Sequence, residues 1–252
     1  MMKLSKLCDW LGGVFGDYTC EDYSNNGLQV EGAADVRKIA FAVDACLETI
    51  EKAASEGADM LFVHHGLSWG GGFKRLTGMD AVRFRALFNS NLSLFAMHLP
   101  LDAHKEIGNN TVLAQRMGLT VTSTFCQCYG MDIGMVCKLD APVPLEKLLD
   151  RALSNISATA KLTDNSQGVA NGVAFVSGGG DFAIEMCKEA GADCLVTGEF
   201  MHQRWHLAHE LGVSVISAGH YDTENTGVKA LMAKVQAELP LETIFIEAPT
   251  GL

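Results

Sequence analysis

The segment Asp59-Met-Leu-Phe-Val-His-His-Gly66 decides the fold class of this chain. It is a short apolar run that ends at two histidines, between a helical pattern ending near residue 57 and another near residues 79–90. Similar apolar runs occupy residues 37–44 and 92–97. Continuous apolar strands between helices are buried on both faces, which is typical of a mostly parallel sheet covered by helices.

The second half of the chain repeats this pattern. The stretch Glu189-Ala-Gly-Ala-Asp-Cys-Leu-Val196 resembles Glu56-Gly-Ala-Asp-Met-Leu-Phe-Val63 in its helix end, turn and strand. Further apolar runs lie at residues 172–177 and 213–217. We therefore expect an α/β protein with two related three-layer α/β/α lobes. The approximate bounds are 1–124 and 125–252, and the lobes can exchange terminal elements.

Composition excludes several classes of partner. The 252 residues carry 19 Lys and Arg against 30 Asp and Glu, a formal net charge of −11. Scattered cations do not suit nucleic acid or an anionic membrane surface. No apolar run approaches the roughly 18 residues of a membrane span, and Asp9 and Asp17 interrupt any signal-peptide core. With eight cysteines mostly inside apolar patterns, the sequence predicts a cytoplasmic location.

Side chains that can bind metal ions follow three of the apolar runs. In open α/β sheets, ligands bind at the carboxyl ends of the strands. Imidazole mixed with carboxylate suits Zn²⁺, Mn²⁺, Ni²⁺ or Fe²⁺, and carboxylates can bridge two ions. The number of such side chains fits a two-metal centre. The candidates are His64, His65, His98, Asp102, His220 and Glu224.

Two of these candidate ligands also have a purely structural explanation, because Asp102 and Glu224 can cap helices.

Two glycine-rich stretches also allow either a functional or a structural interpretation. The Gly178-Gly179-Gly180 stretch is either a phosphate-binding loop or an ordinary turn before an N-cap at Asp181. The segment Trp69-Gly-Gly-Gly-Phe73 is either a mobile lid or a surface loop without a role.

A set of short motifs resembles a known family. The motifs occur in the expected order from about residue 23 to the C-terminus, and their set is similar to the NGG-interacting-factor-three-like family. Members of this family are often labelled GTP cyclohydrolase I type 2 homologues, and this chain resembles the short form without an inserted domain. The motifs are Asn25-Asn-Gly-Leu-Gln-Val-Glu31, Val63-His-His-Gly66, His98-Leu-Pro-Leu-Asp-Ala-His104 with Gly108-Asn-Asn110, Thr197-Gly-Glu199, and Ala218-Gly-His220 with Glu224.

The resemblance implies a particular site and assembly. It implies two intertwined lobes and a toroidal homohexamer whose metal sites face an internal cavity. His202 and His206 fall outside the family pattern, and we expect that His202 does not reach the site. The implied dinuclear centre is formed by His64, His65, Asp102, His220 and Glu224, with His98 beside it.

Three functions follow from these observations. The first is a hydrolase with two divalent ions per subunit, in which His98 acts as a general acid and base. The family label implies a small-molecule substrate, with hydrolytic opening of the imidazole ring of GTP and release of formate. No P-loop motif occurs in the sequence. The alternatives are a non-catalytic metal-binding protein, such as a metallochaperone, regulator or adaptor, and a two-metal phosphoesterase.

Overall fold

The computed structural model describes residues 1–252 as two compact units. The first unit contains residues 1–101 and 228–248, and the second contains residues 102–227 and 249–252. The chain thus crosses between the units more than once, and helix α9 (His220–Glu238) begins in the second unit and ends in the first. The expected two-lobe α/β fold is confirmed. Asp102, which the sequence analysis assigned to the N-terminal lobe, belongs to the second unit.

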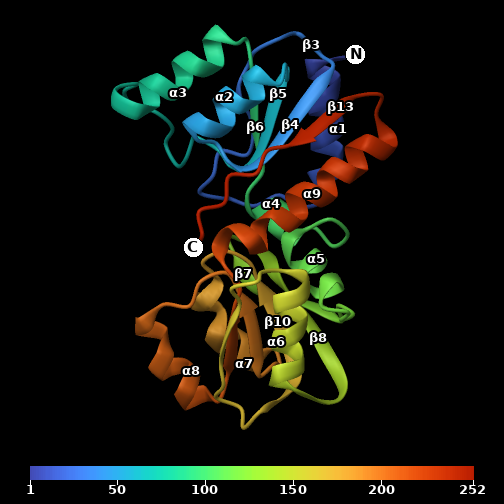
Figure 1. Cartoon of the computed structure of the whole chain (residues 1–252), viewed down its shortest axis with the longest axis vertical. Coiled ribbons are helices and arrows are strands. Elements are labelled where there is room, and N and C mark those ends of the chain that lie inside the picture. Colours follow the sequence, from blue (N-terminus) through green and yellow to red (C-terminus); the bar gives the residue numbers. More distant parts are fainter. The chain divides into compact units, whose positions relative to one another are not determined.

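The first unit is built around a five-stranded sheet in the order β13-β4-β5-β6-β2 (Figure 1). Pairings β13–β4, β4–β5 and β5–β6 are parallel, and β2 joins the edge in antiparallel fashion. The carboxyl ends of β4, β5 and β6 therefore lie at one edge of the sheet. The strands are β2 (Gly27–Val30), β4 (Lys38–Asp44), β5 (Met60–His65), β6 (Ser93–Ala96) and β13 (Glu242–Phe245).

Helices cover both faces of this sheet (Figure 1). On one face, α2 (Leu47–Ser55) and α3 (Gly78–Asn89) pack against alternate strand residues such as Leu61 and Val63. The other face carries a stack of phenylalanines, in which the Phe62 ring lies 5.5 Å from Phe41 and 5.7 Å from Phe95. Helix α1 (Leu4–Phe15) lies on this second face. Burial on both faces explains why the strands are continuously apolar.

The second unit contains a six-stranded sheet in the order β7-β8-β10-β11-β12-β9. Only β10–β11 and β11–β12 are parallel, while the three remaining pairings are antiparallel. The expectation of mostly parallel sheets is therefore met in the first unit, whereas this sheet is mixed. The strands are β7 (Ser123–Cys128), β8 (Met131–Pro144), β9 (Lys161–Thr163), β10 (Val169–Val176), β11 (Cys194–Thr197) and β12 (Ser214–Ser217).

Four helices accompany this sheet. Helices α5 (Asn109–Arg116) and α6 (Leu145–Asn155) contribute to the core beside β8 and β10. Helix α7 (Ile184–Glu189) contacts β11, and α8 (Trp205–Leu211) contacts β12. Residues His202–Arg204, directly before α8, form the separate 3₁₀ turn η2.

The remaining elements are short. They are β1 (Met2–Lys3) paired with β3 (Asp35–Val36), helix α4 (Leu99–Ala103) and the 3₁₀ turn η1 (Gly180–Ala183). All eight cysteines are free thiols, and four of them are buried. None of the helices combines the length and apolar character needed to cross a lipid bilayer.

Candidate metal centre

Three imidazoles come together at the carboxyl edge of the first sheet. His64 and His65 are the last two residues of β5, and His98 follows β6. Nitrogen atoms of the three rings lie within 4.8 Å of one another, so that they can hold a single metal ion. The ring centroid of His64 is 4.5 Å from that of His65 and 5.1 Å from that of His98. All three are among the strand-end side chains that the sequence indicates as candidates for the site.

Each of these rings is held through Nδ1. The Nδ1 atom of His64 lies 3.0 Å from the carbonyl oxygen of Met97. The corresponding atom of His65 lies 2.8 Å from a carboxylate oxygen of Asp44, and that of His98 lies 3.0 Å from Asp22. Because these oxygens only accept hydrogen bonds, each Nδ1 carries the hydrogen atom.

Asp22 fixes the His98 segment from a buried position. Its side chain is 1% exposed, and it accepts hydrogen bonds from Asn26 Nδ2 at 2.9 Å and from the Leu99 amide at 3.0 Å. Burial by itself raises the pKa of Asp22, but the hydrogen bond and charge of His98, with donors from Asn26 and the Ser24 amide, lower that pKa to about 2. Asp22 is therefore a carboxylate at neutral pH.

Trp69 forms one wall beside the three imidazoles. Its ring centroid lies 5.1 Å from that of His98 in an edge contact and 6.1 Å from that of His65. The indole N–H donates to the Gly66 carbonyl at 2.9 Å. Phe73, at the other end of the glycine stretch, packs edge-on against Phe84 at 4.8 Å. Both aromatic residues of the segment considered as a lid are thus packed against the first unit.

A second group of possible ligands lies in the second unit. His220 and Glu224 are one helical turn apart at the start of α9, with His220 Nε2 3.1 Å from Glu224 Oε2. His220 Nδ1 lies 2.6 Å from Glu199 Oε1. The hydrogen bond to Glu224 raises the pKa of His220, whereas burial lowers it. The charge of Glu224 and the hydrogen bond and charge of Glu199 raise it further, so that the pKa of His220 is about 9. The two carboxylates thus favour positive charge between them.

The triple glycine has a packing role. A Cβ atom at Gly178, whose φ is +59°, would contact the Glu224 carboxylate. The amides of Gly178 and Gly180 donate to the hydroxyls of Thr223 and Thr197, each at 3.0 Å. These two amides are therefore committed within the unit, which argues against a phosphate-binding loop here. Asp181 does not cap a helix, because it accepts from the Met201 amide at 2.8 Å instead.

Asp102 is tied to the helix that carries His220 and Glu224. Its Oδ1 atom accepts from Asn109 Nδ2 at 2.8 Å and from the Ser177 hydroxyl at 2.9 Å. Asn109 Oδ1 in turn accepts from the amide of Gly227 on α9 at 2.7 Å. Asp102 and Asn109 are 5% and 0% exposed. The buried Asn109 amide therefore links Asp102 to α9, a role beyond helix capping.

Sequence reasoning found the imidazoles but missed their partners. Asp44 and Glu199 stand at or just after the end of a buried strand, as the candidate histidines do. Their position at a strand end could therefore have identified both carboxylates from the sequence. Asp22 and Asn109 had no such signal, because neither stands at a strand end. His202 and His206 are exposed and join neither group of possible ligands.

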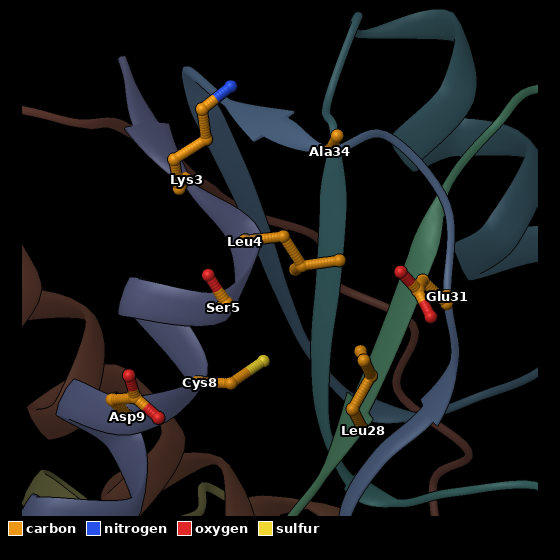
Figure 2. A pocket seen from close by; sticks show the side chains of 8 residues that line it. All are labelled: Lys3, Leu4, Ser5, Cys8, Asp9, Leu28, Glu31 and Ala34. Atoms are coloured by element: carbon orange, nitrogen blue, oxygen red, sulfur yellow. The ribbon is translucent and has the colours of Figure 1, made fainter.

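Two cavities of the first unit adjoin α1. One, of about 410 Å³, is lined mainly by apolar residues and by Asn26 and Met97, which hold His98 and His64. The other, of about 470 Å³, is shown in Figure 2, where Cys8 points across the space toward Leu28. Burial, with the charges of Asp9 and Glu31, raises the pKa of the Cys8 thiol. Cys8 is therefore a poor nucleophile.

The fold and the donor set define a class of protein: a two-lobed α/β protein with His and Glu groupings that can bind a metal ion. A family model described as Duf34/NIF3 (NGG1p interacting factor 3) matches residues 2–251. The chain therefore belongs to the Duf34/NIF3 family, as its motifs indicated.

Individual relatives agree with this assignment. A protein of Pyrococcus abyssi named GTP cyclohydrolase 1 type 2 homolog is 46% identical over 257 residues, with 100% of both chains covered. The solved structure of ybgI, a protein of unknown function, has a TM-score of 0.92 at 33% identity, again with 100% of both chains covered. TTHA1606 of Thermus thermophilus has a TM-score of 0.86 at 38% identity over 100% of both chains.

Proposed function

We propose that this chain is a metal-dependent hydrolase that binds two divalent ions, Zn²⁺, Mn²⁺, Ni²⁺ or Fe²⁺. The observation that carries the proposal is the meeting of three imidazoles whose nitrogen atoms lie within 4.8 Å of one another. Imidazole with carboxylate is a donor set that these ions accept. The proposed ligands are His64 and His65 of this cluster with Asp102, His220 and Glu224 of the second unit. We assign the third imidazole, His98, a role beside the ions rather than as a ligand.

When bound, the ions lower the pKa of water toward neutrality and stabilise the negative charge that develops during hydrolysis. We assign proton transfer to His98. Its Nδ1 hydrogen is held by the buried carboxylate of Asp22 at 3.0 Å, so that the neutral ring exchanges a proton with the substrate at Nε2.

The substrate that we propose is a small molecule, and a nucleotide is the first candidate. The name GTP cyclohydrolase 1 type 2 homolog of the Pyrococcus relative supports this choice. The corresponding reaction is hydrolytic opening of the imidazole ring of GTP with release of formate. The net charge of −11 supports a small ligand rather than nucleic acid.

We also propose the assembly and the compartment. The family resemblance supports a toroidal homohexamer. Eight free cysteines support a reducing compartment, the cytoplasm. Sedimentation of the purified protein tests the first proposal, because a chain that remains monomeric at micromolar concentration contradicts the hexamer.

The central test combines metal analysis with turnover. The purified chain is stripped with a chelator, loaded with each ion in turn, and assayed with GTP, phosphoesters and cyclic amidines. We expect two ions per chain, with loss of binding and turnover in His65→Ala. The matched control is His202→Ala, which removes an exposed imidazole outside the candidate centre and should leave both unchanged.

Each outcome identifies a different function. Release of formate from GTP by the wild type but not by His65→Ala supports the hydrolase. Turnover of phosphoesters alone indicates a two-metal phosphoesterase. Two tightly bound ions without turnover indicate a metallochaperone, regulator or adaptor. A chain that binds none of the ions contradicts the metal centre.

A further inference from the structure

Two exposed carboxylates repeat the same relationship to a histidine in the two units. In the first unit, His65 Nδ1 lies 2.8 Å from Asp44 Oδ1. In the second, His220 Nδ1 lies 2.6 Å from Glu199 Oε1. In the first unit, Asp44 ends β4, which runs parallel to β5, the strand that ends at His65. In the second unit, Glu199 follows β11, which runs parallel to β12, the strand before His220. The arrangement therefore occurs twice, in two separate sheets.

The backbone fixes both pairs. Asp44 is the register partner of His65 in the β4–β5 ladder, and the Ala45 amide donates to the His65 carbonyl at 2.8 Å. In the second unit, the Glu199 amide donates to the Gly178 carbonyl at 2.9 Å. Backbone hydrogen bonds at the strand ends therefore place each carboxylate, independently of the imidazole ring that it contacts.

Stability alone does not account for these pairs. The side chains of Asp44 and Glu199 are 38% and 40% exposed, and ion pairs this exposed contribute only about 0–1 kcal/mol. Their specific effect is on the ring. A carboxylate accepts the Nδ1 hydrogen, so that in the neutral imidazole the lone pair lies on Nε2, the nitrogen that a cation would take. In His220 this nitrogen lies 3.1 Å from Oε2 of Glu224, which is itself a proposed ligand.

We propose that Asp44 and Glu199 are positioning residues, which hold His65 and His220 in the tautomer and ring orientation that bind a divalent cation through Nε2. This inference rests on the proposed metal centre and deepens it. Neither carboxylate is itself a ligand. Loss of such an outer partner typically weakens metal binding about 10- to 100-fold.

The experiment measures Co²⁺ and Zn²⁺ affinity by chelator competition, together with the visible spectrum of the Co²⁺-loaded chain, for Asp44→Asn and Glu199→Gln. Both variants keep the size of the side chain, but their amides can present an N–H group to Nδ1 and favour the wrong tautomer. We expect about 10- to 100-fold weaker binding and a changed Co²⁺ spectrum, with the unfolding midpoint of the metal-free chain unchanged.

The controls separate positioning from general stability. Asp44→Glu retains the carboxylate and should recover part of the affinity. Glu51→Gln and Glu185→Gln remove exposed carboxylates elsewhere in each unit and should bind as the wild type does. Variants that bind Co²⁺ as tightly as the wild type overturn the positioning role while the metal centre stands. A wild-type chain that binds neither ion overturns the proposed function and this inference together.

Discussion

Gly178 lies directly against the carboxylate of Glu224, so closely that any Cβ atom at position 178 would collide with it. The same Cβ would lie 3.1 Å from Nε2 of His220. The backbone φ of +59° at Gly178 also belongs to the region that favours glycine. The first residue of the triple glycine therefore makes room for two candidate metal ligands.

Gly178→Ala should destabilise the chain and weaken metal binding. The unfavourable φ costs about 1–2 kcal/mol, and the new methyl group must displace the Glu224 side chain. The matched control is Gly179→Ala, because a Cβ there meets nothing within 4 Å and φ is −79°. Unfolding midpoints and chelator competition for both variants provide the measurement. Equal behaviour of the two variants contradicts this account.

Asn109→Ala should be strongly destabilising, although no sequence pattern singles this residue out for stability. The substitution removes the donor to Asp102 and the acceptor for the Gly227 amide, and both partners are buried in the second unit. Each buried group left without its hydrogen bond costs about 1–3 kcal/mol. Asn155→Ala, which removes an exposed amide, should cost less than about 0.5 kcal/mol. Urea unfolding of the metal-free variants tests this difference, and comparable losses would refute it.

Asp22→Asn should reduce stability in a manner that depends on pH. The folded-state pKa of about 2 lies below the ordinary 3.8, so ionised Asp22 stabilises the fold by about 2 kcal/mol above pH 4. That contribution is lost as the pH falls from about 4 through 2. The gap in unfolding free energy between wild type and variant should therefore narrow over this range. A gap that stays constant down to about pH 2 would rule out the assigned cause.

Phe62→Ala should cost about 3–5 kcal/mol, as expected for a fully buried aromatic ring. Phe62 is 0% exposed and stacks between Phe41 and Phe95 on one face of the first sheet. Phe88→Ala is the control, because this ring is 60% exposed. Thermal unfolding of both variants is the measurement, and similar midpoints would show that the stack contributes little.

Much of the fold could be predicted from the spacing of apolar residues. The runs at 37–44 and 59–63 became β4 and β5, because strands buried on both faces must be continuously apolar. The antiparallel edges of the second sheet were not predicted. Strands such as β9, only Lys161–Thr163, are too short for a periodic signal.

The sequence by itself determined the strand-end imidazoles, because a residue that follows a buried parallel strand must emerge at the carboxyl edge of its sheet. Only the tertiary structure decided what holds those rings. Asp22 lies 76 residues from His98, and Asn109 lies 118 residues from Gly227. Hydrogen bonds between such distant positions depend on how the chain packs, and no local pattern of residues encodes that packing.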